Sequence, residues 1–250
     1  MLSKDTAICI RATDFSETSQ IVIFFSREHG KISAIAKGSK RPKSAFGGTI
    51  EMFSNGKIVF TDTDKEKLST LTEFEPNYGE SAQGGLQKNL FALNCCFFAA
   101  ELLNKLTHDY DPHPELFDSF LQFLQDAKEE KENKQTLVLL IFFQLSLLKE
   151  IGLQPILNSC VNCKSSHQSR ATSDEIYFSS FANGIICKDC EMSFPDKIRI
   201  SKQTANCLGN LKLIAESQEK ILKEIEKILI HHFTELLGHR LKMAKHILKP

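Results

Sequence analysis

Cys160-Val161-Asn162-Cys163 and Cys187-Lys188-Asp189-Cys190 are two cysteine pairs separated by 23 residues, and they decide how this part of the chain must fold. Each CxxC pair makes a tight turn that presents two thiolates to one ion, and two pairs complete the tetrahedron that Zn²⁺ prefers. We therefore expect Cys160, Cys163, Cys187 and Cys190 to form one zinc site. Because four protein ligands leave no coordination position open, this metal should be structural and not catalytic.

The residues between the two pairs indicate a hairpin that returns the chain to the site. Tyr177-Phe178 and Ile185-Ile186 predict two short strands, and Asn183-Gly184 between them is a hairpin turn signal. Two alternatives stay open for the site. His167 could replace one cysteine as a ligand. The four cysteines could also be buried thiols or disulfides, although the other four lie singly or adjacent in apolar surroundings, unlike a disulfide framework: Cys9, Cys95, Cys96 and Cys207.

Length and composition are those of an ordinary globular protein, but the charge is unevenly distributed. The 250 residues are 42% hydrophobic and 25% charged, enough for one large domain or a few small ones. The net charge is zero, yet residues 27–57 carry an excess of five positive charges and residues 201–250 an excess of four. Residues 81–155 carry an excess of four negative charges. Two basic ends around an acidic middle indicate an anionic partner that the zero total hides.

Several function classes find no support in the sequence. Residues 1–5 lead directly into a strand pattern, so we expect no signal peptide. The longest apolar run, Leu137–Leu148, is shorter than the roughly 18 residues of a membrane span. Free cysteines beside a thiolate metal site fit a reducing cytoplasm. The chain has no Walker A loop, GxGxxG motif, HExxH motif or nucleophile elbow.

The first 80 residues predict a small β-barrel, either an OB-fold or an SH3-like barrel, or else a sandwich. Asn55-Gly56 is a hairpin turn signal within this region. The segments expected to form strands are Thr6–Ala12, Ser19–Ser26, Lys31–Lys37, Thr49–Ser54, Lys57–Thr61 and Leu68–Phe74.

A linker at residues 76–85 is followed by helical periodicity. Ser201 and Ser217 are candidate N-caps for the last two helices. His231-His232 and His239 on the last helix are either a metal pair or, more simply, exposed or half-buried histidines. The expected helices are Gln87–Leu106, Glu115–Lys128, Gln135–Ile151, 201–215 and about 218–248.

The second informative stretch is a basic loop, Ala36–Gly48, with the sequence AKGSKRPKSAFGG. Four cations within seven residues, together with glycines and the hydroxyls of Ser39 and Ser44, predict binding to phosphates of a nucleic acid, with a solvated loop as the alternative. Phe46 and Phe53 are either stacking surfaces for bases or core residues. The candidate DNA-binding residues are Lys37, Lys40, Arg41 and Lys43 in the loop, with Arg27 and Lys57 as outer contacts.

These stretches together resemble the RecO family of bacterial recombination mediators. Gly30-Lys31, residues 36–44 and Phe46-Gly47-Gly48 look like that family's N-terminal signature. Residues 150–155 lead into the first cysteine pair, and residues 183–190 contain the second, as in the family. Two departures are mild: the chain has Ser39-Lys40 where the family often has Ala-Arg, and Ala45 where many members carry another arginine.

The resemblance implies an α+β multidomain fold, with an OB-fold barrel at 1–80, a helical domain at 81–155 and 196–250, and an inserted four-cysteine zinc module at 156–195. It implies a non-enzymatic, cytoplasmic and nucleoid-associated protein that binds single- and double-stranded DNA and anneals complementary strands. It further implies partnership with RecR and with the C-terminal tail of single-stranded-DNA-binding protein, so that RecA is loaded onto coated strands in the RecF pathway.

Annealing would work electrostatically, because a basic protein lowers the repulsion between two phosphate backbones. The basic residues of the last helix would add a second surface. Two rival functions stay open. One is a zinc-ribbon enzyme, such as a nuclease or transferase, that uses Asp189 and Glu191 beside the second cysteine pair. The other is an adaptor without affinity for DNA.

Overall fold

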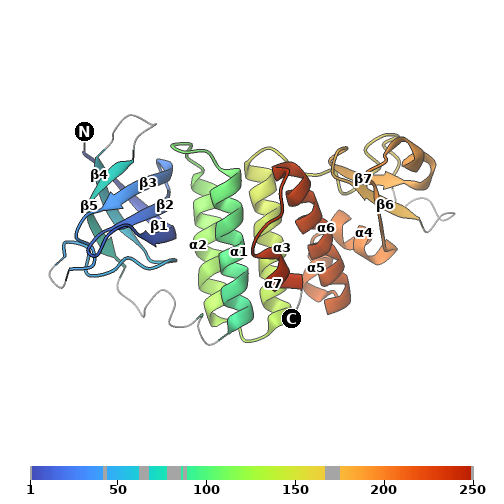
Figure 1. Cartoon of the computed structure of the whole chain (residues 1–250). Coiled ribbons are helices and arrows are strands. Elements are labelled where there is room, and N and C mark those ends of the chain that lie inside the picture. The colour runs from blue at the N-terminus through green and yellow to red at the C-terminus, as the bar shows by residue number, and fades with distance from the viewer. Residues whose placement is uncertain are drawn as a thin grey trace. The chain divides into compact units, whose positions relative to one another are not determined.

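The computed structural model describes residues 2–41, 44–61, 68–77, 86, 89–166 and 175–248 (Figure 1). The chain divides into two compact units, Met1–Glu129 and Glu130–Pro250. Each unit has its own buried core and is described by itself. The domain boundaries expected from the sequence stay a prediction.

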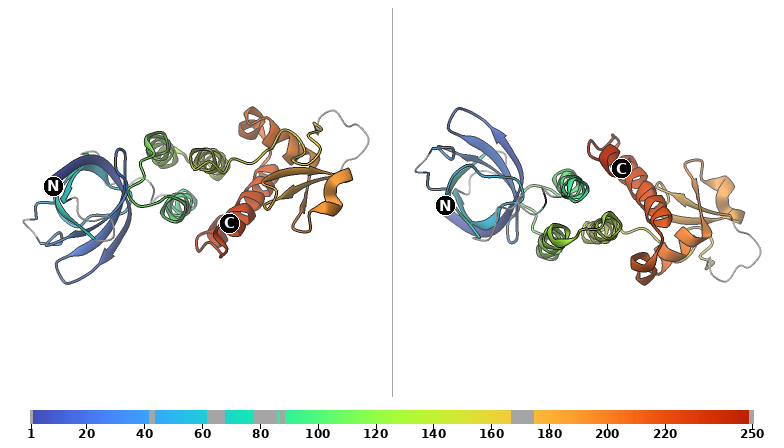
Figure 2. Two further views of the ribbon diagram at one scale, coloured as in Figure 1. Left: turned by 90° about the horizontal axis from the view of Figure 1, so that it is seen from above. Right: turned by 90° about the horizontal axis from the view of Figure 1, so that it is seen from below.

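The first unit begins with a closed five-stranded barrel, whose strands surround its interior in both views of Figure 2. The strand order is β1-β2-β3-β5-β4, in which β3 and β5 are parallel and the other neighbours are antiparallel. This closed barrel confirms the expected OB-type fold. Its strands are β1 (Leu2–Asp14), β2 (Gln20–Ser26), β3 (Gly30–Ala36), β4 (Asn55–Thr61) and β5 (Ser69–Pro76).

The barrel core follows from alternation along the strands, as every second residue of β3 is buried. Phe46 and Phe53 are only 6% and 2% exposed, so both belong to the core and neither offers a surface for stacking. The expected strand at 49–54 is wrong, because these residues form turns and irregular chain. The expected hairpin turn at Asn55-Gly56 is also wrong, since both residues lie in β4 and Gly56 pairs with Ala7 of β1.

After the barrel, the described residues of the first unit form the helices α1 (Leu90–Leu106) and α2 (Pro114–Glu129). The side chain of Asn89 caps α1 by accepting from the N–H groups of Phe91 and Ala92, which explains why α1 begins three residues after the expected start. Leu116, Phe117 and Phe120 form part of the buried face of α2.

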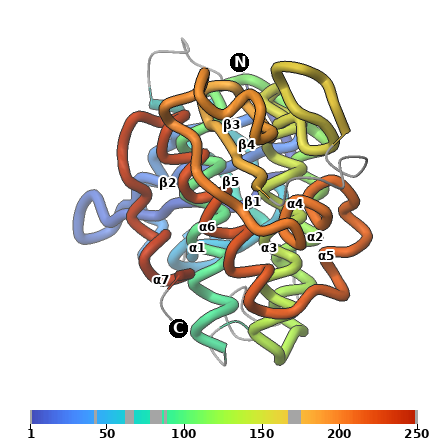
Figure 3. Tube along the Cα trace, turned by 90° about the vertical axis from the view of Figure 1, so that its right-hand side faces the viewer, coloured from blue at the N-terminus to red at the C-terminus, as the bar shows by residue number. Residues whose placement is uncertain are grey.

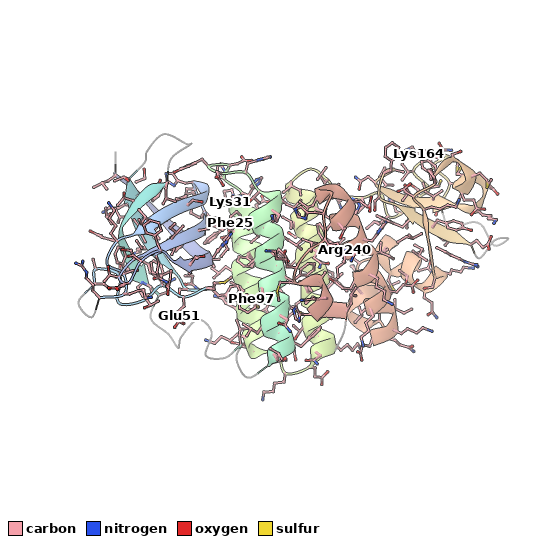
Figure 4. All side chains as sticks on the ribbon, viewed as in Figure 1. Phe25, Lys31, Glu51, Phe97, Lys164 and Arg240 are labelled. Carbon is pink, nitrogen blue, oxygen red and sulfur yellow. The ribbon has the colours of Figure 1, made fainter. Side chains whose placement is uncertain are left out.

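Aromatic and charged contacts join the barrel to these helices. The rings of Phe25 and Phe117 are 6.3 Å apart, and those of Phe53 and Phe97 are 5.2 Å apart. Lys31 Nζ donates to the carbonyl groups of Asn104 and Thr107 at 2.9 and 2.8 Å, near the end of α1. Figure 4 shows Phe25, Lys31 and Phe97 at this boundary. Lys31 therefore neutralises helix-end carbonyls and is used for structure.

The second unit contains α3 (Asn133–Glu150), α4 (Lys202–Gly209), α5 (Lys212–Glu216), α6 (Glu219–Leu237) and α7 (Ala244–Leu248). Helix α6 contacts α3, α4 and α7, and Figure 3 traces these helices from yellow to red. The single helices expected at 201–215 and 218–248 are each broken. Asn210 ends α4 in an extended conformation, and Gly238, with φ of 67°, ends α6 in the left-handed conformation.

Of the two candidate N-caps, Ser201 is confirmed and Ser217 is not. The hydroxyl of Ser201 accepts from the N–H of Thr204 at the start of α4. The hydroxyl of Ser217 instead donates to the carbonyl of Leu213, and Gln218 precedes α6 without a side-chain cap.

The cysteine pairs lie in a small module with a three-stranded sheet in the order β7-β6-β8. The expected hairpin is confirmed, with Asn183 in its turn at φ of 52°. The third strand had not been expected. The elements are β6 (Ile176–Ser179), β7 (Gly184–Cys187), the 3₁₀ helix η2 (Lys188–Ser193) and β8 (Ile198–Ile200). Among the described residues of the whole chain, no helix is long and apolar enough to cross a membrane.

Candidate metal centre and nucleic-acid interface

The structure brings the four predicted cysteines together. The Sγ atoms of Cys160, Cys163, Cys187 and Cys190 all lie within 4.8 Å of one another. Those of Cys163 and Cys187 are 3.6 Å apart, and all four cysteines are free thiols. Four thiols at these separations can bind one metal ion, so the alternative of disulfides is not supported. The alternative ligand His167 lies outside the described residues.

Backbone hydrogen bonds fix the first cysteine pair against the hairpin. The N–H of Val161 donates to the carbonyl of Ile185 at 2.8 Å, and the N–H of Cys187 points at Sγ of Cys160 at 3.5 Å. Gly184 allows the close approach, because a Cβ at this position would lie 2.4 Å from the carbonyl oxygen of Ile156. The hairpin and the first CxxC turn therefore form one unit around the sulfur atoms.

The polar surroundings of the thiols favour thiolates at the exposed side of the cluster. Hydrogen bonds from Ser165, the hydroxyl foremost, lower the pKa of the Cys163 thiol to about 6. Burial raises the pKa of the Cys187 thiol to about 12. The side-chain amide of Asn162 donates to Sγ of Cys190 at 3.3 Å. Binding of a metal requires all four groups as thiolates, and these donors stabilise the negative sulfur.

Of the two acidic neighbours of the second pair, Glu191 is engaged with other side chains. Glu191 accepts from Nζ of Lys188 at 2.9 Å, and hydrogen bonds from Tyr177 and then Lys188 lower its pKa. Of the two histidines of α6, His231 is half-buried as expected, whereas His232 is not. His232 is fully buried, with its ring 5.4 Å from that of Phe178, and burial lowers its pKa to about 4. Within the described residues, the cysteine cluster is the one candidate metal site of three or more ligands.

The basic loop begins at the end of the barrel where β1, β2 and β3 meet, since Asp14 pairs with Gln20 and Gln20 with Ala36. Two hydrogen bonds tie it to the turn between β1 and β2. The N–H of Lys40 donates to the carbonyl of Thr18 at 3.1 Å, and the N–H of Gly38 donates to the hydroxyl of Ser19 at 3.3 Å. The loop therefore has a defined place on the barrel.

The buried side chain of Gln20 also anchors the loop. Oε1 of Gln20 accepts from the hydroxyl of Ser39 at 3.0 Å and from the N–H of Ile50 at 2.9 Å. Ser39 is fully buried, so it does not offer the phosphate contact expected from the sequence. The hydroxyl of Ser44 accepts from the N–H of Gly48 at 3.1 Å and thereby serves the loop's own turn.

The candidate cations of the loop differ in their availability. Lys37 and Arg41 are exposed. Lys40 is 28% exposed in its side chain and pairs with Oδ2 of Asp14 at 2.7 Å. Lys43 lies outside the described residues. Two exposed cations and one paired cation are thus placed at the end of the barrel.

The two outer candidates lie elsewhere on the barrel. Nε and Nη2 of Arg27 donate to both carboxylate oxygens of Asp118 in α2, at 3.0 and 2.9 Å. These hydrogen bonds raise the pKa of Arg27 and lower that of Asp118. Lys57 is exposed on β4, opposite Glu75 of β5. Arg27 is therefore engaged in a bidentate pair, which makes it the least available of the described candidates.

One exposed aromatic residue was missed by the sequence analysis. Phe15 follows Asp14 in the turn between β1 and β2, and it is 61% exposed. Its signal in the sequence was a single aromatic residue within the polar turn Asp14–Ser19. Phe15 precedes the basic loop by more than 20 residues in sequence, and only folding joins its turn to the loop.

Comparison with known proteins gives consistent similarities over the whole chain. The family described as "Recombination protein O N terminal" matches residues 1–78, and "Recombination protein O C terminal" matches residues 87–244. The chain is 31% identical over 256 residues to the DNA repair protein RecO of Bacillus subtilis, covering 98% of this chain and 93% of the relative. It is 30% identical to the RecO of Halalkalibacterium halodurans, covering 98% and 94%, and 31% identical to that of Rhodopirellula baltica, covering 85% and 75%.

Proposed function

The chain belongs to the RecO family of DNA repair proteins, and on this premise we propose that it is a recombination mediator that binds single- and double-stranded DNA and anneals complementary strands. The observation that carries the proposal is the basic loop, hydrogen-bonded to the β1–β2 turn at one end of a closed barrel. Small barrels of this kind bind nucleic acid along a positive surface.

The mechanism is electrostatic. Lys37 and Arg41 are exposed and bind phosphates directly, while Lys40 exchanges its pairing with Asp14 for a phosphate. Lys43, Lys57 and Arg27 complete the proposed set, with Arg27 contributing least because of its pairing with Asp118. Each contact with a phosphate displaces condensed counterions, so binding weakens as salt is added. Two strands held on one basic protein repel each other less than two free strands.

We assign the cysteine cluster to Zn²⁺. Zinc–sulfur bonds of about 2.3 Å give a tetrahedron with sulfur atoms about 3.8 Å apart. The separations of up to 4.8 Å, and of 3.6 Å between Cys163 and Cys187, fit such a tetrahedron after a small contraction. The ion, when bound, supplies a cross-link between the two CxxC turns. The chain's own role is to hold the module, and no step of DNA binding passes through the metal.

The proposed partners are those of a mediator that acts at the bacterial nucleoid in the cytoplasm: RecR, and the C-terminal tail of single-stranded-DNA-binding protein, from which strands are passed to RecA. The protein is not proposed to be an enzyme. Glu191 is paired with Lys188, and four cysteines would fill the coordination of the metal. An adaptor without affinity for DNA is the alternative that an experiment must exclude.

The test is a salt titration of single-strand binding by fluorescence anisotropy. If about five phosphates are contacted, affinity should fall roughly a hundredfold between about 50 and 200 mM salt. The double variant Lys40→Glu/Arg41→Glu should lose most of the affinity and reduce the slope of log affinity against log salt by about 1.4.

A control variant should change the charge equally at another place. Lys149→Glu/Lys164→Glu reverses two exposed lysines of the second unit and should bind like the wild type. Equal binding by the wild type and the Lys40→Glu/Arg41→Glu variant would remove the loop from the mechanism. Absence of binding by the wild type at low salt would leave the adaptor as the better function.

A further inference from the structure

Phe15 is an aromatic side chain that the barrel leaves in solvent. It is 61% exposed, whereas the phenylalanines within the barrel strands are buried, among them Phe24, Phe60 and Phe74. An exposed ring contributes less to stability than a buried one, because burial of apolar surface stabilises a protein by about 25 cal/mol for each Å². Phe15 contributes little to the fold, since it lies beyond the last residue of β1.

The turn that carries this ring is fixed by the backbone. The N–H groups of Phe15 and Ser16 both donate to the carbonyl of Ser19, at 3.0 and 3.2 Å. The backbone position of Phe15 is therefore set by a closed turn at the end of β1 and β2. A side chain on a fixed backbone loses less entropy on binding than one on a loose chain.

The same turn is joined to the basic loop. Thr18 and Ser19 accept the hydrogen bonds from Lys40 and Gly38, and Asp14, the neighbour of Phe15, pairs with Nζ of Lys40. The turn that carries the exposed ring and the loop that carries the cations are thus hydrogen-bonded to each other at one end of the barrel. This combination is what proteins use to bind single strands, because cations hold the backbone while aromatic rings stack on the bases.

From this juxtaposition we infer that Phe15 is a stacking platform for an unpaired nucleobase, and that it makes the barrel end prefer single-stranded over duplex DNA. The inference rests on the proposed function and adds the residue that distinguishes single-stranded from duplex DNA. Phosphates are offered by both forms of DNA, but the faces of the bases are free only in a single strand. The cations alone would therefore bind both forms, and the ring would favour one of them.

The charge of the surroundings favours a nucleobase over an apolar peptide. Lys37 and Arg41 are exposed cations of the loop that is hydrogen-bonded to this turn, and Asp14 is already paired with Lys40. A polyanion that also presents flat apolar faces satisfies both the ring and the cations. An uncharged apolar segment would cover the ring and leave the cations without a partner.

The experiment compares Phe15→Ala with Phe181→Ala in the full chain. Phe181 is 88% exposed and lies in the cysteine module, so its loss removes an even more exposed ring at a place without the basic loop. Affinity is measured for an oligo(dT) strand, for a strand of deoxyribose phosphates without bases, and for a blunt duplex of the same length.

We expect Phe15→Ala to weaken oligo(dT) binding by between roughly fivefold and a hundredfold, with the salt slope unchanged, because only stacking is removed. Duplex binding should stay as in the wild type, and Phe15→Tyr should restore oligo(dT) binding. The wild type should bind the strand without bases more weakly than oligo(dT). The Phe15→Ala variant should bind these two probes with nearly equal affinity.

Two results would overturn the inference alone: unchanged oligo(dT) binding by Phe15→Ala, or equal losses for oligo(dT) and duplex. A wild type that binds none of the three probes at low salt would instead overturn the proposed function, and the inference with it. The variants remain comparable because Phe15 is exposed, and far-UV circular dichroism and thermal melting check that both alanine variants are folded.

Discussion

The carboxyl group of Glu226 makes a stability prediction that can be worked out in full. It is completely buried on α6, where its Oε1 accepts from Nε2 of Gln144 on α3 at 2.8 Å. Oε2 of Glu226 and Oε1 of Gln144 have no partner among the described residues. When Glu226 is protonated, its Oε2 becomes a hydrogen-bond donor. Oε1 of Gln144, on the residue that already contacts Glu226, is an acceptor without a partner. The protonated form therefore suits the site better than the charged form.

Burial raises the pKa of Glu226 from the ordinary 4.5 to about 7, with the hydrogen bond from Gln144 opposing the shift. Below 4.5 the group is neutral in both folded and unfolded protein. Between 4.5 and about 7 the unfolded chain loses the proton and the folded protein keeps it, so stability falls as pH rises. Above 7 the deficit is constant at about 3 kcal/mol, from about 1.4 kcal/mol for each pKa unit.

Glu226→Gln should remove this dependence. The free energy of unfolding of the variant, minus that of the wild type, should rise by about 2.5 kcal/mol from about pH 5 to about pH 8, because part of the deficit is already present at about pH 5. It is measured by urea denaturation followed by far-UV circular dichroism. His232 on the same helix acts in the opposite sense, because its lowered pKa costs stability as pH falls below 6.5, but it is present in both proteins and cancels.

Glu224 provides the matched control, two positions away on α6. Partial burial opposes the shift, but hydrogen bonds from Ser201 and Thr204 lower the pKa of Glu224. The stability that this carboxylate contributes is present above its unfolded pKa and is lost only at lower pH. Glu224→Gln should therefore destabilise the protein by a constant amount from about pH 5 to about pH 8. A pH-independent difference for Glu226→Gln would refute the reasoning and show that Glu226 is charged in the folded protein.

Two further predictions concern the candidate sites. Asp14→Asn should strengthen single-strand binding severalfold and steepen its salt slope by up to about 0.7, because Lys40 loses its internal partner at 2.7 Å; unchanged anisotropy titrations would contradict this competition. Chelation should expose residues 156–195 to proteolysis while the barrel stays protected, because the metal stabilises a module with only a small core of its own around Tyr177 and Ile186; equal cleavage with and without chelator would argue against a metal.

Local sequence patterns predicted those parts of the fold whose causes are local. The hairpin of the cysteine module, three helices and most barrel strands follow from periodicity and turn residues within a few positions. The segment 49–54 failed because its apolar residues have a non-local partner. The N–H of Ile50 donates to the side chain of Gln20. The N–H of Phe53 donates to the carbonyl of Cys9 in β1, and the N–H of Cys9 donates to the carbonyl of Ser54. The segment therefore has the composition of a strand but an irregular backbone.

The last helix shows a second limit. Its apolar periodicity continues toward Ile247, but Gly238 adopts the left-handed conformation and ends α6. A single glycine within a periodic segment costs about 1 kcal/mol in a helix, which tertiary packing can either absorb or exploit as a C-cap. The sequence alone does not show whether the helix continues through the glycine or ends there, because the outcome depends on the tertiary contacts of the residues that follow it.

The candidate DNA-binding residues show why charge in a sequence is a weaker guide to function than cysteine spacing. Four cysteines in two pairs can reach one point by local turns, so their assembly could be predicted. A lysine or arginine is available only if no carboxylate from another element takes it first. Arg27 is taken by Asp118, which lies 91 residues away in sequence, and Lys40 by Asp14, 26 residues away. Two stretches with the same number of cations can therefore differ in their affinity for DNA. The carboxylates that pair with the cations decide which cations can bind a phosphate.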